Sequence, residues 1–205
     1  WTNPYDTWMA GAKFTKLTIG EGVKQIGNYV FTQANSITEV VIKGDISYIG
    51  AGAFDGLNKL ITINIPSSVT SIGDYAFDGC SSLTGITIPD GITSIGEYTF
   101  SSCSSLTSVT IPDKVTMIGN YAFRDCSKLT SVTIGKKVSA IDKSAFRRCS
   151  NLTSVYCKPV TPPALGDEAF GYTHADMVVY VSRDSVKAYD SSSYWDDFTI
   201  TGYDF

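Results

Sequence analysis

Residues 106–127 read LTSVTIPDKVTMIGNYAFRDCS, and residues 83–104 read LTGITIPDGITSIGEYTFSSCS. The leucines that open these two segments belong to an evenly spaced series, at Leu60, Leu83, Leu106, Leu129 and Leu152. A fixed period of about 23 residues is typical of a solenoid, in which short coils stack and each contacts only its neighbours. The sequence therefore predicts one elongated array, and its function has to be sought where the repeats differ.

The first part of each repeat has the pattern of a short strand. Leu106, Val109 and Ile111 are apolar, and Ser108 and Thr110 alternate with the last two. This alternation, with its β-branched residues, favours a strand that buries one face, and a proline or glycine after it ends the strand. Because equivalent strands of successive coils would lie side by side, we expect one parallel sheet on the concave side.

A glycine column and a phenylalanine column follow the strand. A recurrent glycine indicates either a positive φ angle or a backbone crowded by the next coil. A large ring beside a small residue fills the interior of a coil, and the stretch is too short for a proper helix, so we expect 3-10 or irregular structure on the convex side. The columns are Gly27, Gly50, Gly73, Gly96 and Gly119, and Phe31, Phe54, Phe77, Phe100, Phe123 and Phe146, with Trp8 one repeat earlier.

Four of the five cysteines also share one column, at Cys80, Cys103, Cys126 and Cys149. Stacked coils would bring these residues within about 5 Å of one another, so pairing of the first two and of the last two is compatible with distance. Bridging alternate gaps would distort a regular stack, and we therefore favour reduced cysteines packed as small apolar groups. No closely spaced Cys or His pair indicates a zinc site.

Composition and motifs argue against several classes of function. The net charge of −4 is unfavourable for general nucleic-acid binding, and no long apolar run predicts membrane insertion. The single histidine, His174, stands near no nucleophile signature, and no metal-loop spacing occurs. We therefore expect no enzyme activity, no cofactor and no metal. Because the chain begins at Trp1 and not at Met, we expect a processed or trimmed chain whose targeting signal lies outside it.

The C-terminal part departs from the repeat. A proline-rich stretch from Lys158 to Pro163 adds one residue, and residues 177–181 then alternate as a final strand would. Ser182 or Asp184 is a candidate cap for a short helix through Tyr189. We expect a solenoid of about seven repeats over residues 1–175 and a continuous cap over residues 176–205. The side chains expected to close the core are Val186, Tyr189, Trp195 and Phe198.

The motif L-x-x-V-x-I-P-x-x-V-x-x-I-G-x-Y-A-F-x-x-C-S-x-L over roughly residues 14–171 resembles the BspA-like leucine-rich repeat family, also called the Treponema pallidum type. The tract VVYVSRDSVKAYDSSSYWDDF resembles the usual terminator of that family. The resemblance implies an α/β fold in the leucine-rich-repeat convention, rich in β structure, forming a right-handed curved solenoid. It also implies a bacterial surface or secreted protein that binds host or microbial partners.

Two surfaces are candidate binding sites. The first is the outward face of the sheet, where Asn64, Thr87, Thr110 and Thr133 precede Tyr156, the best aromatic anchor. This polar face also fits a sheet that needs only to be soluble. The second is basic, because residues 124–158 carry eight basic and two acidic residues, and residues 159–205 carry eight acidic and two basic ones. Its members are Lys136, Lys137, Lys143, Arg147 and Arg148. These residues are compatible with an acidic partner such as a sulfated glycan. They are also compatible with solvated turns whose positive charge balances the negative charge of the cap.

A third candidate is the tyrosine column at Tyr75, Tyr98 and Tyr121, for which packing between coils is the favoured use. From these observations we expect a monomeric, non-catalytic extracellular binding module for a protein or surface glycan, acting in adhesion. The alternative is a structural spacer that displays other domains.

Overall fold

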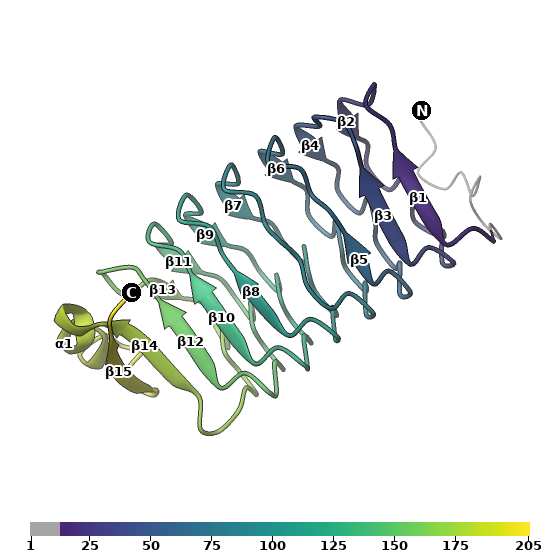
Figure 1. Cartoon of the computed structure of the whole chain (residues 1–205). Helices are drawn as coiled ribbons and strands as arrows, with labels where there is room; N and C mark the ends of the chain where they lie inside the picture. Colours follow the sequence, from purple (N-terminus) through teal and green to yellow (C-terminus); the bar gives the residue numbers. More distant parts are fainter. Residues whose placement is uncertain (1–12) are drawn as a thin grey trace.

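The computed structural model describes residues 13–205, so Trp8 lies outside the described residues. Its coils nest one behind another in an elongated array that ends in a small cap containing the only helices of the described chain (Figure 1). The strand pairs of this array are parallel, as the repeat predicts. The division of the chain near residue 175 stays a prediction.

Two rows of strands run along the array. The longer strands form two sheets, ordered β1-β3-β5 and β15-β14-β12-β10-β8, and the shorter ones form sheets β2-β4-β6 and β13-β11-β9-β7. The row of longer strands comprises β1 (Lys16–Ile19), β3 (Glu39–Ile42), β8 (Ser108–Thr110), β10 (Ser131–Ile134), β12 (Ser154–Cys157), β14 (Val178–Ser182) and β15 (Thr199–Tyr203), and it includes the two-residue β5 (Thr62–Ile63). The shorter ones are β2 (Gln25–Ile26), β4 (Tyr48–Ile49), β6 (Ser71–Ile72), β7 (Ser94–Ile95), β9 (Met117–Ile118), β11 (Ala140–Ile141) and β13 (Ala164–Leu165).

The pairing register explains the period of the sequence. Ser108 pairs with Ser131, which pairs with Ser154, so that one turn of the coil takes one period of the sequence. Ser154 then pairs with Val178, one position beyond the regular period, because the proline-rich stretch adds a residue. Columns of the sequence are therefore columns in space, and the extra residue leaves the alternation of β14 in register with β12.

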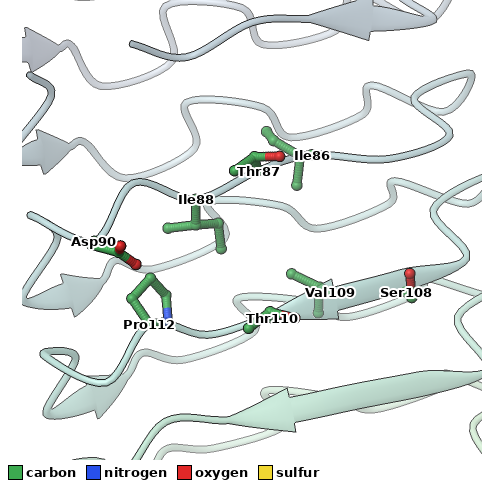
Figure 2. Close-up of a pocket in the computed structure, with 8 residues that line it drawn as sticks. All are labelled: Ile86, Thr87, Ile88, Asp90, Ser108, Val109, Thr110 and Pro112. Atoms are coloured by element: carbon green, nitrogen blue, oxygen red, sulfur yellow. The ribbon is translucent and has the colours of Figure 1, made fainter. Parts of the chain in front are cut away.

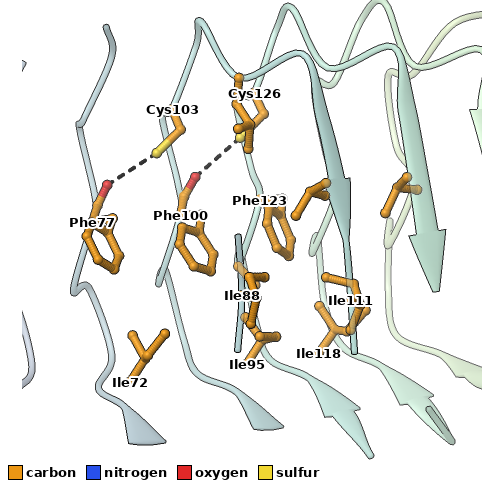
Figure 3. Packing of buried hydrophobic residues seen from close by; sticks show 14 of the residues in the cluster. Ile72, Phe77, Ile88, Ile95, Phe100, Cys103, Ile111, Ile118, Phe123 and Cys126 are labelled. Atoms are coloured by element: carbon orange, nitrogen blue, oxygen red, sulfur yellow. Dashed lines mark hydrogen bonds between the residues drawn. The ribbon is translucent and has the colours of Figure 1, made fainter. Parts of the chain in front are cut away.

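Stacked phenylalanine rings fill the interior of the coils. Phe77, Phe100 and Phe123 are fully buried, and their ring centroids lie 5.4 Å and 5.2 Å apart with nearly parallel planes (Figure 3). The residue before each ring is mostly alanine, which leaves room for the backbone of the turn. Each ring covers its two neighbours, and this sharing is why a single repeat cannot fold alone.

The four column cysteines are buried free thiols. Each thiol donates a hydrogen bond to the carbonyl of a phenylalanine in the preceding coil, as from Cys103 to Phe77 at 3.3 Å and from Cys126 to Phe100 at 3.2 Å (Figure 3). The prediction of reduced cysteines is confirmed. Burial raises the pKa of Cys103 above that of an ordinary thiol, which keeps the side chain neutral in the core.

The glycine column is explained by crowding and not by a positive φ angle. A Cβ atom on Gly50 would lie 2.4 Å from the carbonyl carbon of Gly27 in the preceding coil. Among the described glycines, positive φ angles occur at Gly52, Gly56 and Gly79, outside this column. The left-handed position two residues later is held mostly by tyrosines, such as Tyr98 with φ of 52°.

The tyrosine column packs between coils, as predicted. The ring centroids of Tyr75 and Tyr98 lie 4.9 Å apart, those of Tyr98 and Tyr121 lie 4.7 Å apart, and all three side chains are half-buried. Stacking of this kind contributes about 0.5–1.5 kcal/mol per pair. It therefore offsets part of the cost of about 1–2 kcal/mol for placing a non-glycine residue in the left-handed conformation. The surrounding segments are turns, so the irregular alternative describes this side of the array.

The cap closes the last coil as expected. The 3-10 helix η1 (Arg183–Ser185) leads into helix α1 (Val186–Asp190), and Tyr189 and Trp195 are fully buried. Trp195 Nε1 donates to the carbonyl of Pro163 at 2.7 Å, and the Tyr189 hydroxyl donates to the carbonyl of Pro159 at 2.8 Å. The added proline-rich stretch thus supplies acceptors for the two buried polar groups of the cap.

One detail of the expected cap is wrong. Ser182 precedes η1, but its hydroxyl makes no capping hydrogen bond to the backbone and instead lies 2.7 Å from the hydroxyl of Ser185. Asp184 lies within the first turn of η1, and Ser185, not Asp184, occupies the N-cap position of α1. The two serine side chains satisfy each other because the strand runs directly into the helix.

Candidate functional site

The candidate site lies on the outward face of the longer strands, near the cap. Successive coils place Thr110, Thr133, Tyr156 and Tyr180 side by side in register. Alternation along each strand buries the neighbouring valines and turns these four side chains outward. Two short hydroxyl side chains therefore stand next to two large rings on one surface.

Tyr156 has one covered ring face and one uncovered ring face. Its ring stacks on that of Tyr180, with centroids 4.9 Å apart and planes 15° apart, and Tyr203 meets both rings edge-on at 5.3 and 5.8 Å. The opposite neighbour in register is Thr133, which is too short to cover an aromatic ring. The face of Tyr156 toward β10 is therefore available to a ligand.

A depression of about 580 Å³ is lined by Tyr156 and Thr133. It is a shallow surface hollow, open to solvent, and not an enclosed cavity. The side chains around it are hydroxyl, aromatic and charged, and they come from successive coils and from the strand after the cap helix. They are Thr110, Thr133, Lys136, Tyr156, Lys158, Tyr203, Asp204 and Phe205.

The charge of the depression is dominated by two lysines. The Lys136 ammonium lies 3.8 Å from the carboxylate of Asp113, and this pair is well exposed, so it constrains the lysine weakly. Among residues 13–205, no carboxylate lies within 4 Å of the ammonium of Lys158. Asp204 receives hydrogen bonds from Arg183 at 2.8 and 3.1 Å, which lower the pKa of Asp204 and balance its charge.

A second depression, of about 290 Å³, adjoins the first at Thr110. Figure 2 shows it between the segment with Ile86 and Thr87 and the strand β8 of the next coil. Within the described chain, residues 85–88 form no strand and make no backbone hydrogen bond to either neighbouring coil. A Cβ atom on Gly85 would meet nothing within 4 Å. The sheet is therefore open at this coil.

The smaller depression is a gap between two coils, lined in part by the buried Ile88 and Val109. The two depressions meet at Thr110, and we refer to them together as the trough, from Thr87 to Tyr156.

The structure gathers some of the predicted site residues and separates others. Thr87, Thr110, Thr133, Tyr156 and Lys136 all border the trough.

Asn64 lies on the same face, but its amide donates to the Ile42 carbonyl at 3.0 Å and accepts from the Ile42 amide at 2.8 Å. Asn64 thus links two coils.

The remaining basic residues lie away from the trough. Arg147 forms an ion pair with Glu168 at 2.8 Å, and its guanidinium lies 5.0 Å from the centroid of the Tyr172 ring. Arg148 lies 3.8 Å from Asp125. Lys137 and Lys143 are exposed and have no ion pair among residues 13–205. The predicted basic cluster is therefore divided between Lys136 at the trough and arginines that pair with carboxylates on the turns.

Three side chains of the site are not among the residues predicted from the sequence. Tyr180 follows Tyr156 by one period plus the added residue, so allowing for that residue would have placed it in the same column. Lys158 was counted with the basic stretch without being placed beside Tyr156. Tyr203 belongs to β15, which follows a non-repeating segment and carries no periodic signal.

The single histidine, His174, does not border the trough. His174 is exposed, and its Nδ1 accepts a hydrogen bond from the Asp176 amide at 3.1 Å. Across residues 13–205, no three His, Cys, Asp or Glu side chains gather as a metal site. In the same part of the chain, no helix has both the length and the apolar character needed to cross a membrane.

Comparison with known proteins agrees with this architecture. The family model described as "BspA type Leucine rich repeat region" matches residues 5–89 and 70–200, with six copies. Among curated proteins none matches the chain.

Among solved structures, a leucine-rich repeat protein of T. pallidum is similar at 31% identity with a TM-score of 0.70, over 75% of this chain and 74% of that one. A leucine-rich cell surface protein of Faecalibacterium prausnitzii is similar at 31% identity with a TM-score of 0.74, over 82% of this chain and 48% of that one. The pneumococcal vaccine antigen PcpA, at 15% identity and a TM-score of 0.63, shares the fold.

Proposed function

This chain belongs to the BspA-type leucine-rich repeat family, and from that premise we propose that it is a non-catalytic extracellular binding module at a bacterial surface. The trough is its binding site, and a protein or surface glycan is its ligand. The chain acts as a monomer in this proposal. It spans about half the length of the F. prausnitzii surface protein it resembles, so further domains of a longer protein are compatible with it.

The observation that carries the proposal is the uncovered face of the Tyr156 ring beside a depression of about 580 Å³. The half-buried ring of Tyr98 stacks on both of its faces, whereas Tyr156 stacks on Tyr180 alone. An aromatic side chain that is held rigidly and left partly open is the usual anchor of a recognition surface. The three rings at this point hold one another in place, which lowers the entropy lost on binding.

The arginines on the turns support binding less well. Arg147 already pairs with Glu168 at 2.8 Å and would have to leave that carboxylate before it could pair with an acidic partner, and Arg148 stands 3.8 Å from Asp125. The net attraction of such a surface is therefore small. The proposal accordingly assigns binding to the trough and not to Arg147 and Arg148.

The alternative function is a spacer that displays other domains. It is favoured by the uniform serine and threonine side chains on the strand face before Tyr156, which need only be soluble. A spacer requires a stiff array and no ligand, so the two functions differ in what a binding screen would find.

The test is a screen of the wild-type chain against arrays of glycans and of extracellular host proteins. Tyr156→Ala should lower the leading signal about ten-fold or more, since it removes the anchor. The double variant Arg147→Glu/Arg148→Glu should leave that signal unchanged. Tyr194→Ala, which removes an exposed tyrosine of the cap, is the matched control. An unaltered signal with Tyr156→Ala would contradict the proposal, and the absence of any saturable ligand would favour the spacer.

A further inference from the structure

The shape of the trough narrows the class of ligand. Thr87, Thr110 and Thr133 belong to one column and stand at successive coils, with Tyr156 at the next. Adjacent paired strands lie about 4.8 Å apart, so Thr110, Thr133 and Tyr156 span roughly 10 Å, and Thr87 lies one coil beyond them, across the open part of the sheet. A ligand that contacts all of them has to be elongated and to lie across the strands.

From β8 to β12 the floor of the trough offers hydroxyl groups and no free strand edge, whereas within the described chain the backbone of residues 85–88 is unpaired. Between β8 and β12, the backbone groups are used in parallel pairing with neighbouring strands. A peptide therefore cannot add to this part of the sheet as an extra strand. Threonine hydroxyls that both donate and accept are suited to a chain of hydroxyl groups with the same capacity.

The uncovered ring face fits the flat apolar side of a sugar ring. Tyr156 lies next to the short side chain of Thr133, so a ring-shaped group of the ligand would occupy the space that another aromatic ring would fill. Tyr180 and Tyr203 fix the orientation of Tyr156 from the other side.

Charge distinguishes the two ends of the trough. Lys136, Lys158 and Asp204 border the end near Tyr156, where Asp204 is paired with Arg183, and Asp90 borders the end near Thr87. Two ammonium groups beside an aromatic face favour a carboxylate near Tyr156. At the other end, the Asp90 carboxylate can accept hydrogen bonds from neutral hydroxyl groups of a ligand but repels a ligand carboxylate.

We propose that the trough binds a linear oligosaccharide that carries carboxylates, with one sugar ring against Tyr156 and its carboxylate between Lys136 and Lys158. This inference rests on the proposed function and names the ligand class of the same site. The neighbouring sugars lie over Thr133 and Thr110 and direct hydroxyl groups toward them.

Calorimetric titration with tetragalacturonate tests the inference, and its fully methyl-esterified form is the neutral probe of the same shape. The acid should bind about ten-fold more tightly than the ester, because only the acid can pair with the lysines. Lys136→Gln/Lys158→Gln should remove this difference, and Lys128→Gln, on an exposed turn, should not alter it. Equal binding of the acid and the ester to the wild type would overturn the role of charge.

A second variant separates binding from folding. Thr133→Tyr would place a ring on the open face of Tyr156 and continue the stack of Tyr156 on Tyr180. It deletes no contact of the core and should leave the melting temperature at or above that of the wild type. Binding of tetragalacturonate should fall about ten-fold or more, since the ring occupies the place of the sugar. Unchanged binding would overturn the inference.

A tetraglutamate peptide decides between the saccharide and an acidic peptide. Tighter binding of the peptide than of tetragalacturonate would show that charge alone, or a peptide, is recognised, and the inference would be wrong. Failure of tetragalacturonate to bind, with Tyr156→Ala still abolishing the binding of a ligand found in the array screen, would support the proposed function and contradict the ligand class. If neither Tyr156→Ala nor Thr133→Tyr changes the binding of any ligand, the proposed function and the ligand class are both wrong.

Discussion

Replacing Phe123 by alanine is the sharpest test of how the coils hold together. The side chain is fully buried, and its ring lies 5.2 Å from both the Phe100 ring and the Phe146 ring. Removing a buried phenylalanine ring costs about 3–5 kcal/mol when the cavity cannot collapse. Rings on both sides prevent collapse here, so we expect a loss in the upper part of that range.

Urea unfolding followed by circular dichroism measures this loss. A chain of this length should lose roughly 2–4 °C of melting temperature per kcal/mol, so thermal unfolding should fall by about 10 °C or more. Ile61→Ala is the control, because that side chain is 49% exposed and its truncation should change the unfolding free energy by less than about 0.5 kcal/mol.

A double-variant cycle tests the stacking itself. Phe100→Ala and Phe123→Ala remove neighbouring rings, so their losses should be non-additive by about 0.5–3 kcal/mol. Phe54→Ala and Phe146→Ala are separated by several coils, and their losses should add within about 0.5 kcal/mol. A loss below about 1 kcal/mol for Phe123→Ala, or additive losses for the neighbouring pair, would refute the packed column.

Three further outcomes follow from individual residues. Thr99→Val should raise the unfolding free energy by about 1 kcal/mol, because the buried Thr99 hydroxyl has no hydrogen-bond partner among residues 13–205 and valine has a similar shape. A lower unfolding free energy in urea titration would contradict this. Gly50→Ala should lower the free energy of unfolding by about 1–3 kcal/mol, because the added Cβ atom would clash with the preceding coil. Gly85→Ala should leave the free energy of unfolding nearly unchanged, because its Cβ atom would meet nothing within 4 Å. All five cysteines are buried, and burial raises the pKa of Cys157 to about 12. Thiol reagents should therefore not react with the folded chain between about pH 7 and 9 but should react with all five thiols after unfolding, and rapid labelling of the folded chain would contradict this.

The sequence predicts the array well because the period of the chain is the period of the structure. The phenylalanine, tyrosine, cysteine and glycine columns all became contacts between coils, as for Phe100 with Phe123 and Tyr98 with Tyr121. The glycine column was predicted with two alternatives, and only coordinates could decide between them. The close approach of Gly50 to Gly27 depends on the distance between backbones and not on residue type.

The site was predictable only in part. Tyr156 stands out in its column by size alone, but its open face depends on the small Thr133 beside it and on β15 beyond it. Charge counting also grouped Arg147 with Lys136, although the arginine pairs with Glu168 of the following coil. Which charged side chains pair between coils depends on their distances in space, and a count of charges along the chain does not give those distances.

A crystal structure of the protein with tetragalacturonate would show directly where the saccharide lies. We expect a sugar ring parallel to the Tyr156 ring, over Thr133, with a carboxylate within about 4 Å of Lys136 or Lys158. A saccharide bound on the turns around Arg148, or an empty trough at saturating concentration, would contradict this expectation.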